Sequence, residues 1–476
     1  MAQAQAGLRV LFSPDYAARS IAIAGATILN AVNVLIATTI LPSVVRDIGG
    51  QNLYAWNTTL YVIASIIGAA LAPRVLVRLG PRTAFRIAVV AFFLGALVCT
   101  VAPTMVVLLL GRTVQGFGGG FLGTLTYAII RQAYPATLWP RAFALNSAMW
   151  GIATVSGPAI GGIFGELGVW RLAFGTVLPI SIALGFLFER ILRDMGRPEI
   201  ALTRVPVPQL VLLTASVLAV SAGSIDDSAV SNALGIAVAA ILIVWLSRTE
   251  GRTANRLLPL GTLNPRAPLG LVFAAMVLLM IGVSADVFTP YFLQLLHGLS
   301  PLAAGYMVAL MSAGWTVGSV LVSGATGVRA QIVILGGPLL MAGGLAVMAF
   351  SVPADANGLL RLSAIGLGLV LLGTGMGSTW PHLLSRALAM APHHEQALAA
   401  TSMTTVQLVG SAFGAALGGV ITNLTDYSDL AGGGTATAAA WYFGLFCLAP
   451  LGAFLLSVVV VRRAGHVPLA DPATSH

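Results

Sequence analysis

Residues 105–130 read MVVLLLGRTVQGFGGGFLGTLTYAII. A helix needs about 20 predominantly apolar residues to cross the hydrocarbon core of a bilayer, and Arg112 is the only charged residue in this stretch. Its many glycines would let neighbouring helices approach closely, as helices do in membranes. The stretch therefore predicts a transmembrane helix that packs among other helices.

The whole chain has the composition of this stretch. Of 476 residues, 58% are hydrophobic and only 8% are charged, whereas about a quarter of the residues of a soluble domain are charged. The two cysteines, Cys99 and Cys447, both lie in apolar stretches, so a disulfide framework is not expected. We predict an all-α polytopic membrane protein.

Apolar windows between turn and charge signals predict fourteen spans. The expected spans cover residues 18–42, 55–77, 83–103, 105–130, 142–165, 171–190, 208–224, 230–247, 269–292, 302–324, 330–351, 358–380, 400–422 and 438–461.

The positive charges are distributed unequally across these spans. All 24 basic residues are arginines; only Arg46, Arg171 and Arg361 fall on one side, and Arg112 lies inside a span. Arginine-rich connections stay in the cytoplasm, so we expect both termini there and the chain in a bacterial cytoplasmic (inner) membrane. No basic run is long enough for a nucleic-acid interface.

The spans divide the chain into three parts: residues 1–200 with six spans, residues 201–265 with two additional spans, and residues 266–476 with six more. No connection is long enough for a nucleotide-binding domain, and there is no GxxxxGK[ST] phosphate loop. We therefore expect the energy to come from an ion gradient or from nothing beyond the substrate's own gradient, and we expect no bound cofactor.

Span four carries a polar face. Helical spacing places Arg112, Gln115, Gly116, Gly119 and Gly123 on one side, and a guanidinium this deep in a membrane needs protein partners or a water-filled cavity. It could serve proton coupling or anion recognition, or it could simply hold two helices together.

Span five has a smooth face and a bend. Gly157, Gly161 and Gly165 recur every fourth residue beside Gly162, so a neighbouring backbone can approach, and Pro158 removes a backbone donor. The pattern suits a gating helix, although packing alone would also explain it.

These two segments resemble the major facilitator superfamily, specifically its fourteen-span drug:proton antiporter branch. The span-four match is R-x-x-Q-G-x-G-G and the span-five match is G-P-x-x-G-G. The resemblance implies two six-helix bundles plus two extra central helices, with alternating access driven by a proton gradient.

Two departures from the family pattern bear on mechanism. The loop after span two usually carries an aspartate, which normally belongs to a cytoplasmic charge relay, and here that position is Val77. Span one commonly carries an aspartate where this chain has Asn33. Asn30 and Asn33 could line the cavity, or they could only bridge helices.

Asp286 is the only carboxyl group that we place within a span. Helical spacing puts it on one face with Gly282, Thr289 and Pro290, and apolar surroundings favour the neutral acid, as a reversible proton carrier requires. Alternatively it is an interfacial carboxyl paired with a hydroxyl. Further cavity candidates, each of which could instead be packing, are Asn146, Trp150, Tyr306, Trp315, Trp380 and Gln407.

We predict a secondary active transporter that exports lipophilic small molecules, which we expect to be neutral, zwitterionic or weakly acidic. The alternative is a nutrient symporter or facilitator of the same fold. No catalytic motif points to an enzyme. The adjacent histidines His393 and His394, which precede Glu395, would point in different directions on a helix, and no third ligand is evident, so we expect no metal site. We expect a monomer in the lipid bilayer.

Overall fold

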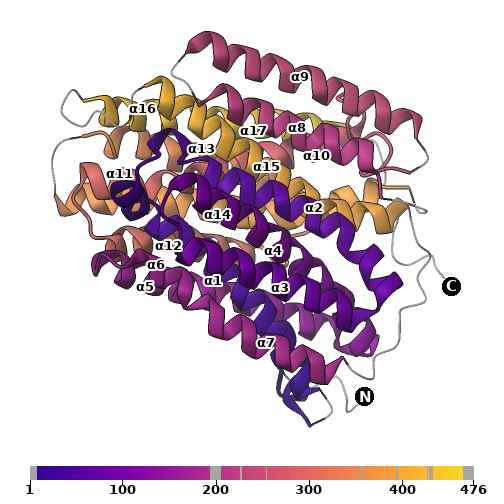
Figure 1. The fold of residues 1–476 in the computed structure, drawn as a ribbon. Coiled ribbons are helices and arrows are strands. Elements are labelled where there is room, and N and C mark those ends of the chain that lie inside the picture. Colours follow the sequence, from indigo (N-terminus) through magenta and orange to yellow (C-terminus); the bar gives the residue numbers. More distant parts are fainter. Residues whose placement is uncertain are drawn as a thin grey trace. The chain divides into compact units, whose positions relative to one another are not determined.

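The structure is a computed structural model. It describes residues 8–14, 16–192, 205–225, 228–253, 255–354, 358–392, 395–425, 427 and 433–464. Every labelled element in Figure 1 is a helix, which confirms the predicted all-α class. The pair His393 and His394 lies outside the described residues.

The predicted spans correspond to the observed helices. Among the described residues, 13 helical segments are long and apolar enough to cross a membrane. The expected span 208–224 matches α8 (Val207–Gly223), which has 17 residues, fewer than any of these 13 segments, and is about 26 Å long at 1.5 Å per residue. Together they match the fourteen predicted spans.

Contacts divide the chain into two units. Unit 1 comprises residues 1–207 and 287–309. Its helices are η2 (Leu8–Phe12), α1 (Ala17–Ile48), η3 (Gln51–Leu53), α2 (Trp56–Leu79), α3 (Pro81–Thr100), α4 (Met105–Ala133), η4 (Ala136–Leu138), α5 (Trp139–Glu166), α6 (Trp170–Gly175), α7 (Val177–Ile191), α11 (Thr289–Leu296) and the start of α12 (Pro301–Leu321).

Unit 2 comprises residues 208–286 and 310–476. Besides α8 and the rest of α12, its helices are α9 (Ala229–Arg252), α10 (Pro268–Val283), η5 (Ser284–Asp286), α13 (Gly327–Ser351), α14 (Leu359–Met390), α15 (Gln396–Leu424), α16 (Gly434–Phe446) and α17 (Leu448–Ala464). The division predicted at residues 200 and 265 stays a prediction.

Glycine sets the packing of α4 against α2. A Cβ at Gly116 would collide with the backbone of Tyr61, and one at Gly120 with the backbone of Ser65. The Ser65 hydroxyl donates to the Gly116 carbonyl oxygen at 2.9 Å. The glycine-rich stretch of α4 is therefore a surface on which the backbone of α2 packs directly, as is expected of small residues in membrane helices.

Span nine is not one continuous helix, and this corrects the predicted face of Asp286. The α-helix α10 ends at Val283, Asp286 closes a 3-10 turn, and α11 starts at Thr289 with Pro290 in its first turn. Proline lacks an amide hydrogen, and the first turn of a helix is the place where that hydrogen has no partner to lose, so Pro290 suits the start of a new helix. Helical spacing therefore fails across this break.

The two extra helices form a tight hairpin within unit 2. Gly223 of α8 and Gly235 of α9 face each other, and a Cβ on either would contact the other's Cα at 3.1 Å. Apolar residues of both helices pack against each other and against Val409 of α15. The side chain of Asn423, also on α15, donates to the Ser224 carbonyl oxygen. The hairpin is thus joined to the rest of unit 2.

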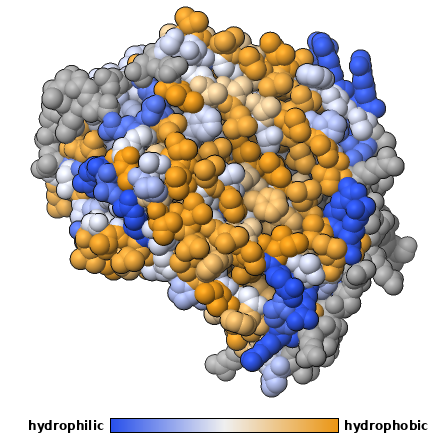
Figure 2. All heavy atoms as spheres, viewed as in Figure 1, coloured by the Kyte–Doolittle hydropathy of each residue, from blue (hydrophilic) through white to orange (hydrophobic). Residues whose placement is uncertain are grey.

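Apolar side chains cover most of the face shown in Figure 2, and hydrophilic residues gather toward its rims. The exposed apolar residues include Phe350, Leu359 and Leu360, each more than four-fifths accessible. Such extensive apolar exposure is incompatible with water and is what a lipid environment requires. The chain is a multi-pass membrane protein.

Candidate transport site

A polar cluster lies among α1, α2 and α4 of unit 1. Arg112 donates from Nη1 to Gln115 Oε1 at 2.7 Å, and Gln115 donates from Nε2 to Asn33 Oδ1 at 2.9 Å. The Tyr61 hydroxyl donates to Asn30 Oδ1 at 2.5 Å, and its ring centroid lies 4.1 Å from the Arg112 guanidinium carbon. We call these five residues the Arg112 cluster.

The cluster encloses a positive charge without a carboxylate. Arg112 is 2% exposed, and Asn33 and Gln115 are fully buried. In the described part of the chain no carboxylate forms a salt bridge with Arg112, and its buried Nε has no hydrogen-bond partner. A buried cation is costly unless it is paired, and the cation–π contact with Tyr61 supplies only part of that compensation.

Both asparagines of α1 therefore bridge helices in this structure. Asn33 reaches α4 through Gln115, and Asn30 reaches α2 through Tyr61. Gly119 provides the space, because a Cβ there would lie 2.6 Å from the Tyr61 hydroxyl. The expectation that they line a substrate cavity stays a prediction.

The glycine face of α5 contacts helices on two sides. A Cβ at Gly157 would press on Leu35 of α1. A Cβ at Gly162 would collide with the Cα of Leu302 on α12, and one at Gly165 would lie 3.1 Å from Pro301. The smooth face therefore lets α12 pack directly on α5.

Gly161 and Pro158 complete this face. A Cβ at Gly161 would lie 3.1 Å from Thr39 of α1, and a Cβ on Gly305 of α12 would lie 3.0 Å from Pro158. Both Gly161 and Pro158 are buried. The two residues thus pack α5 against α1 and α12. Their part in gating stays a prediction.

The remaining candidates in unit 1 occupy different environments. Asn146 is buried, accepts a hydrogen bond from Thr27 and donates to the Tyr127 hydroxyl at 3.3 Å. Trp150 is 45% exposed. Tyr306 is 39% exposed and donates to the Val155 carbonyl oxygen at 3.2 Å. Asn146 therefore joins helices, while the two aromatic residues leave surface accessible.

The candidates in unit 2 include Asp286, which is half-buried in the 3-10 turn η5. Trp380 is buried, and Trp315 and Gln407 are half-buried. The backbone of Trp315 packs against Gly377 of α14. Their roles in coupling and substrate contact stay predictions.

A family model described as Major Facilitator Superfamily matches residues 23–415. The chain belongs to this superfamily. A "Probable multidrug-efflux transporter" of Mycobacterium tuberculosis is 38% identical over 446 residues, covering 92% of this chain and 93% of that protein. A "Multidrug transporter protein" of Bacillus subtilis is 26% identical, covering 84% of this chain and 74% of its own.

Solved structures support the fold alone. A peptide transporter of the POT family in complex with sulfate aligns with a TM-score of 0.69 at 14% identity over 94% of both chains. A D-xylose-proton symporter aligns with a TM-score of 0.63 at 15% identity over 90% of this chain and 96% of its own. The major facilitator fold predicted from sequence is confirmed.

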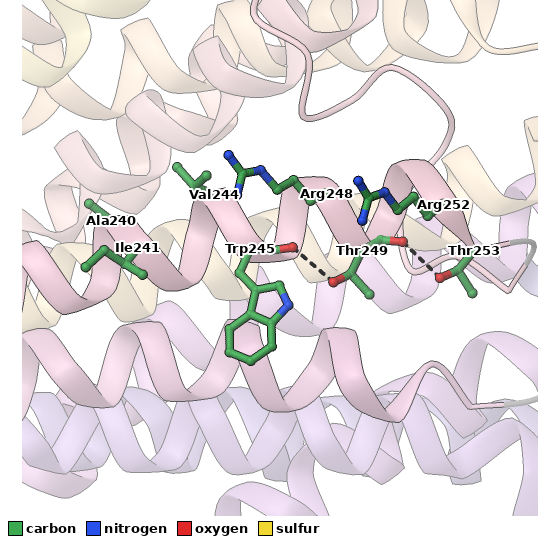
Figure 3. Close-up of a pocket in the computed structure, with 8 residues that line it drawn as sticks. All are labelled: Ala240, Ile241, Val244, Trp245, Arg248, Thr249, Arg252 and Thr253. Carbon is green, nitrogen blue, oxygen red and sulfur yellow. Dashed lines mark hydrogen bonds between the residues drawn. The ribbon is translucent and has the colours of Figure 1, made fainter.

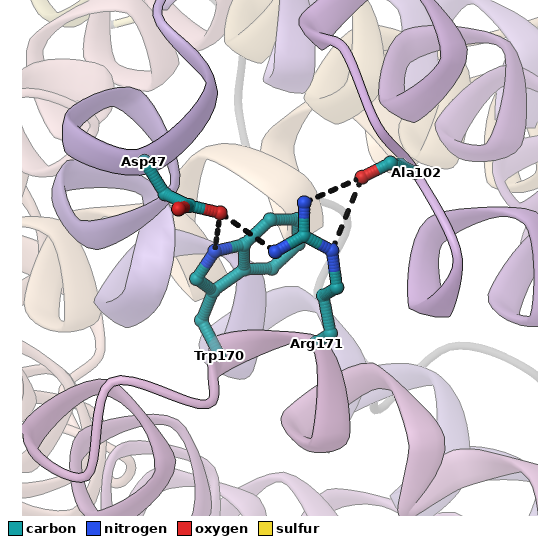
Figure 4. Close-up of polar contacts among 4 residues, drawn as sticks. All are labelled: Asp47, Ala102, Trp170 and Arg171. Carbon is teal, nitrogen blue, oxygen red and sulfur yellow. Dashed lines mark hydrogen bonds and ion pairs between the residues drawn. The ribbon is translucent and has the colours of Figure 1, made fainter.

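A second polar group joins three segments of unit 1 (Figure 4). Arg171 at the start of α6 donates to Asp47 Oδ2 at 2.6 Å and, from Nη2, to the Ala102 carbonyl oxygen at 2.9 Å. Trp170 donates to the same Asp47 oxygen at 3.0 Å. We call these residues the Arg171 clamp; it ties the end of α1 and the loop before α4 to α6.

The loop after span two lacks the family's aspartate, but an ion pair lies next to it. Glu189 in the last turn of α7 pairs with Arg82 and Arg86 of α3, with Arg86 Nε at 2.6 Å from Glu189 Oε1. The prediction that Asp286 is the only carboxyl group within a span is therefore wrong, because Glu189 lies inside the expected span 171–190. It sits at the charged end of that span.

Sequence reasoning missed Tyr61 and Glu189. Tyr61 stands in an apolar stretch of α2 with no pattern around it, and only its position beside Gly116 and Gly119 in three dimensions gives it a role. Glu189 had a signal, since Glu189 and Arg190 are adjacent charges ending an apolar run. A glutamate at the end of a span, on the side of the membrane where the arginines gather, was a candidate partner for an ion pair.

Proposed function

We propose that this chain exports lipophilic small molecules across a bacterial inner membrane in exchange for protons, by alternating access. The observation that carries this proposal is the 38% identity over 92% of the chain to a protein described as a multidrug-efflux transporter. The family is one of transporters, and we propose no catalytic activity.

The Arg112 cluster supports a preference about substrate charge. It holds a buried guanidinium whose Nε lacks a partner, and its other members are neutral amides and a phenol. A positive charge repels cations in a medium of low dielectric constant. We propose that neutral, zwitterionic and weakly acidic apolar molecules are preferred over permanent cations.

Reconstitution into proteoliposomes tests both parts. Flux of a lipophilic weak acid and of a permanent cation of similar size is measured with and without an imposed pH gradient. We expect gradient-dependent flux that is faster for the acid. Flux that ignores the gradient would contradict proton coupling, and proton-driven uptake of a polar nutrient would favour the symporter alternative.

We also propose cytoplasmic termini and a functional monomer. In a variant without Cys99 and Cys447, Ser228→Cys before α9 should react with an impermeant maleimide from outside intact cells. Ser323→Cys, between α12 and α13, should react only after permeabilisation. Both Ser228 and Ser323 are exposed, so the reverse pattern would overturn the orientation.

A further inference from the structure

Helix α9 presents a long apolar face to its surroundings. Val230, Leu234 and Ile241 are each more than three-fifths exposed, and Trp245 is 60% exposed. On the other side of the helix, Leu246 is buried against Leu212 and Leu213 of α8. An exposed apolar face of this size on a membrane-spanning helix is suited to contact with lipid.

A groove of about 730 Å³ follows the last three turns of this face. Its apolar part includes Ile241, Val244 and Trp245, and its polar part includes Arg248 and Arg252. Figure 3 shows the two arginines extending side by side along α9, while Trp245 extends across the ribbon away from them. The groove thus changes from apolar to cationic along the helix.

The positive charge of this groove is not neutralised by the described residues. Arg248 and Arg252 are exposed, and neither forms an ion pair with any of them. Glu250 lies between them in sequence, but it is buried and accepts a hydrogen bond from the Leu257 amide at 2.8 Å. Arg256 is also engaged, at 2.8 Å from Glu395.

The hydroxyl groups beside the arginines are occupied by the helix itself. Thr249 donates to the Trp245 carbonyl oxygen at 3.0 Å, and Thr253 donates to the Thr249 carbonyl oxygen at 2.9 Å. The two guanidinium groups are therefore the donors that remain for a ligand, and their forked geometry suits phosphate oxygens.

We propose that this groove binds an anionic phospholipid. The arginines would hold the phosphate, Trp245 would lie at the level of the headgroup boundary, where tryptophan is enriched, and Ile241 with Val244 would contact an acyl chain. A zwitterionic headgroup also carries a positive charge, which the arginines repel, so its net attraction to this site is weaker than that of an anionic headgroup. Each arginine near an anionic surface contributes a factor of about five to binding.

Quenching of Trp245 by brominated lipid tests this proposal. The full chain is reconstituted in phosphatidylcholine that contains either brominated phosphatidylglycerol or brominated phosphatidylcholine, and the signal of a Trp245→Phe variant is subtracted. We expect the relative affinity for the anionic lipid to exceed that for the zwitterionic lipid by about 25-fold, the product of two such factors. Equal quenching by the two lipids would overturn the proposal.

A matched control separates this groove from the general positive charge of the membrane face. Arg74 and Arg78 of α2 are also one turn apart near a helix end. Replacing Arg248 and Arg252 by glutamine should abolish the anionic preference at Trp245, whereas Arg74→Gln with Arg78→Gln should preserve it. An equal loss in both double variants, or no loss in the first, would contradict a specific site.

Discussion

The fixed positive charge of unit 1 and the candidate proton carrier of unit 2 sit on very different backbones. Arg112 lies about two turns into the unbroken helix α4 and is enclosed by amide and aromatic neighbours. Asp286 lies where span nine breaks, between α10 and α11, and is only half-buried. A rigid helix suits a charge that must stay ionised, whereas a break gives a carboxyl group access to alternative surroundings.

This difference suggests a division of labour that substitution can test. Arg112 keeps its charge at any physiological pH, so it can bias electrostatics but cannot carry a proton. A carboxyl group can change its charge, and its binding of a proton can shift a conformational equilibrium only if the two states bind the proton differently.

The largest effect is expected at Arg112. Arg112→Ala removes the donor to Gln115 and leaves a buried acceptor unsatisfied, a penalty of about 1–3 kcal/mol; transport should fall by about tenfold or more. Arg112→Lys keeps the positive charge but loses the planar guanidinium group with its five donors, so this variant should also transport poorly. Flux is measured in proteoliposomes at equal protein, with Arg78→Lys, exposed at the end of α2, as the control. Normal flux in Arg112→Ala would show that Arg112 contributes to helix packing and not to transport.

Asp286→Asn should uncouple transport without preventing it. The variant cannot bind and release a proton, so gradient-driven accumulation should disappear while substrate exchange continues. Asp286→Glu should retain partial coupling with a shifted pH profile, and Asn33→Asp could restore coupling in the Asp286→Asn background. Glu166→Gln, at the exposed end of α5, serves as the carboxylate control and should pump normally. If Asp286→Asn pumps against a gradient, Asp286 has a structural role.

The glycine face of α5 offers a comparison within one helix. Gly162→Ala places a methyl group against the Leu302 backbone, whereas nothing lies within 4 Å of a Cβ at Gly151. We expect Gly162→Ala to cost about 1–3 kcal/mol of packing and to lower the thermal unfolding midpoint in detergent. Gly151→Ala should leave that midpoint unchanged or raise it slightly. Equal midpoints for the two variants would show that α12 does not pack closely on α5.

The smallest effect is expected at Glu189. Its two arginine partners are about half exposed, and exposed ion pairs contribute about 0–1 kcal/mol. Glu189→Gln should therefore change stability little, and the difference from the parent protein should shrink as salt is added. A large, salt-independent loss of transport would instead assign this pair the function of the family's missing loop aspartate.

The sequence predicted the helices well because hydrophobic length is a strong constraint in a membrane. It did not predict the break at residues 284–288, since the apolar window continues through this turn and only Pro290 indicates an end. It identified Arg112, Gln115 and Asn33 as candidates, because polar residues are rare in spans. It did not predict that Tyr61 stacks on Arg112, because that contact depends on how α2 and α4 pack rather than on local pattern.

The two charged residues of the Arg171 clamp are not interchangeable, because Arg171 donates hydrogen bonds to a second acceptor besides Asp47. Arg171 serves a carboxylate and a backbone carbonyl at once, because its guanidinium presents five donors. Exchanging the two charges by Asp47→Arg with Arg171→Asp would recreate the attraction but leave the Ala102 carbonyl oxygen facing an acceptor. Attraction between opposite charges is symmetric, but hydrogen-bond donation is not, so the two residues should change together in relatives without trading places.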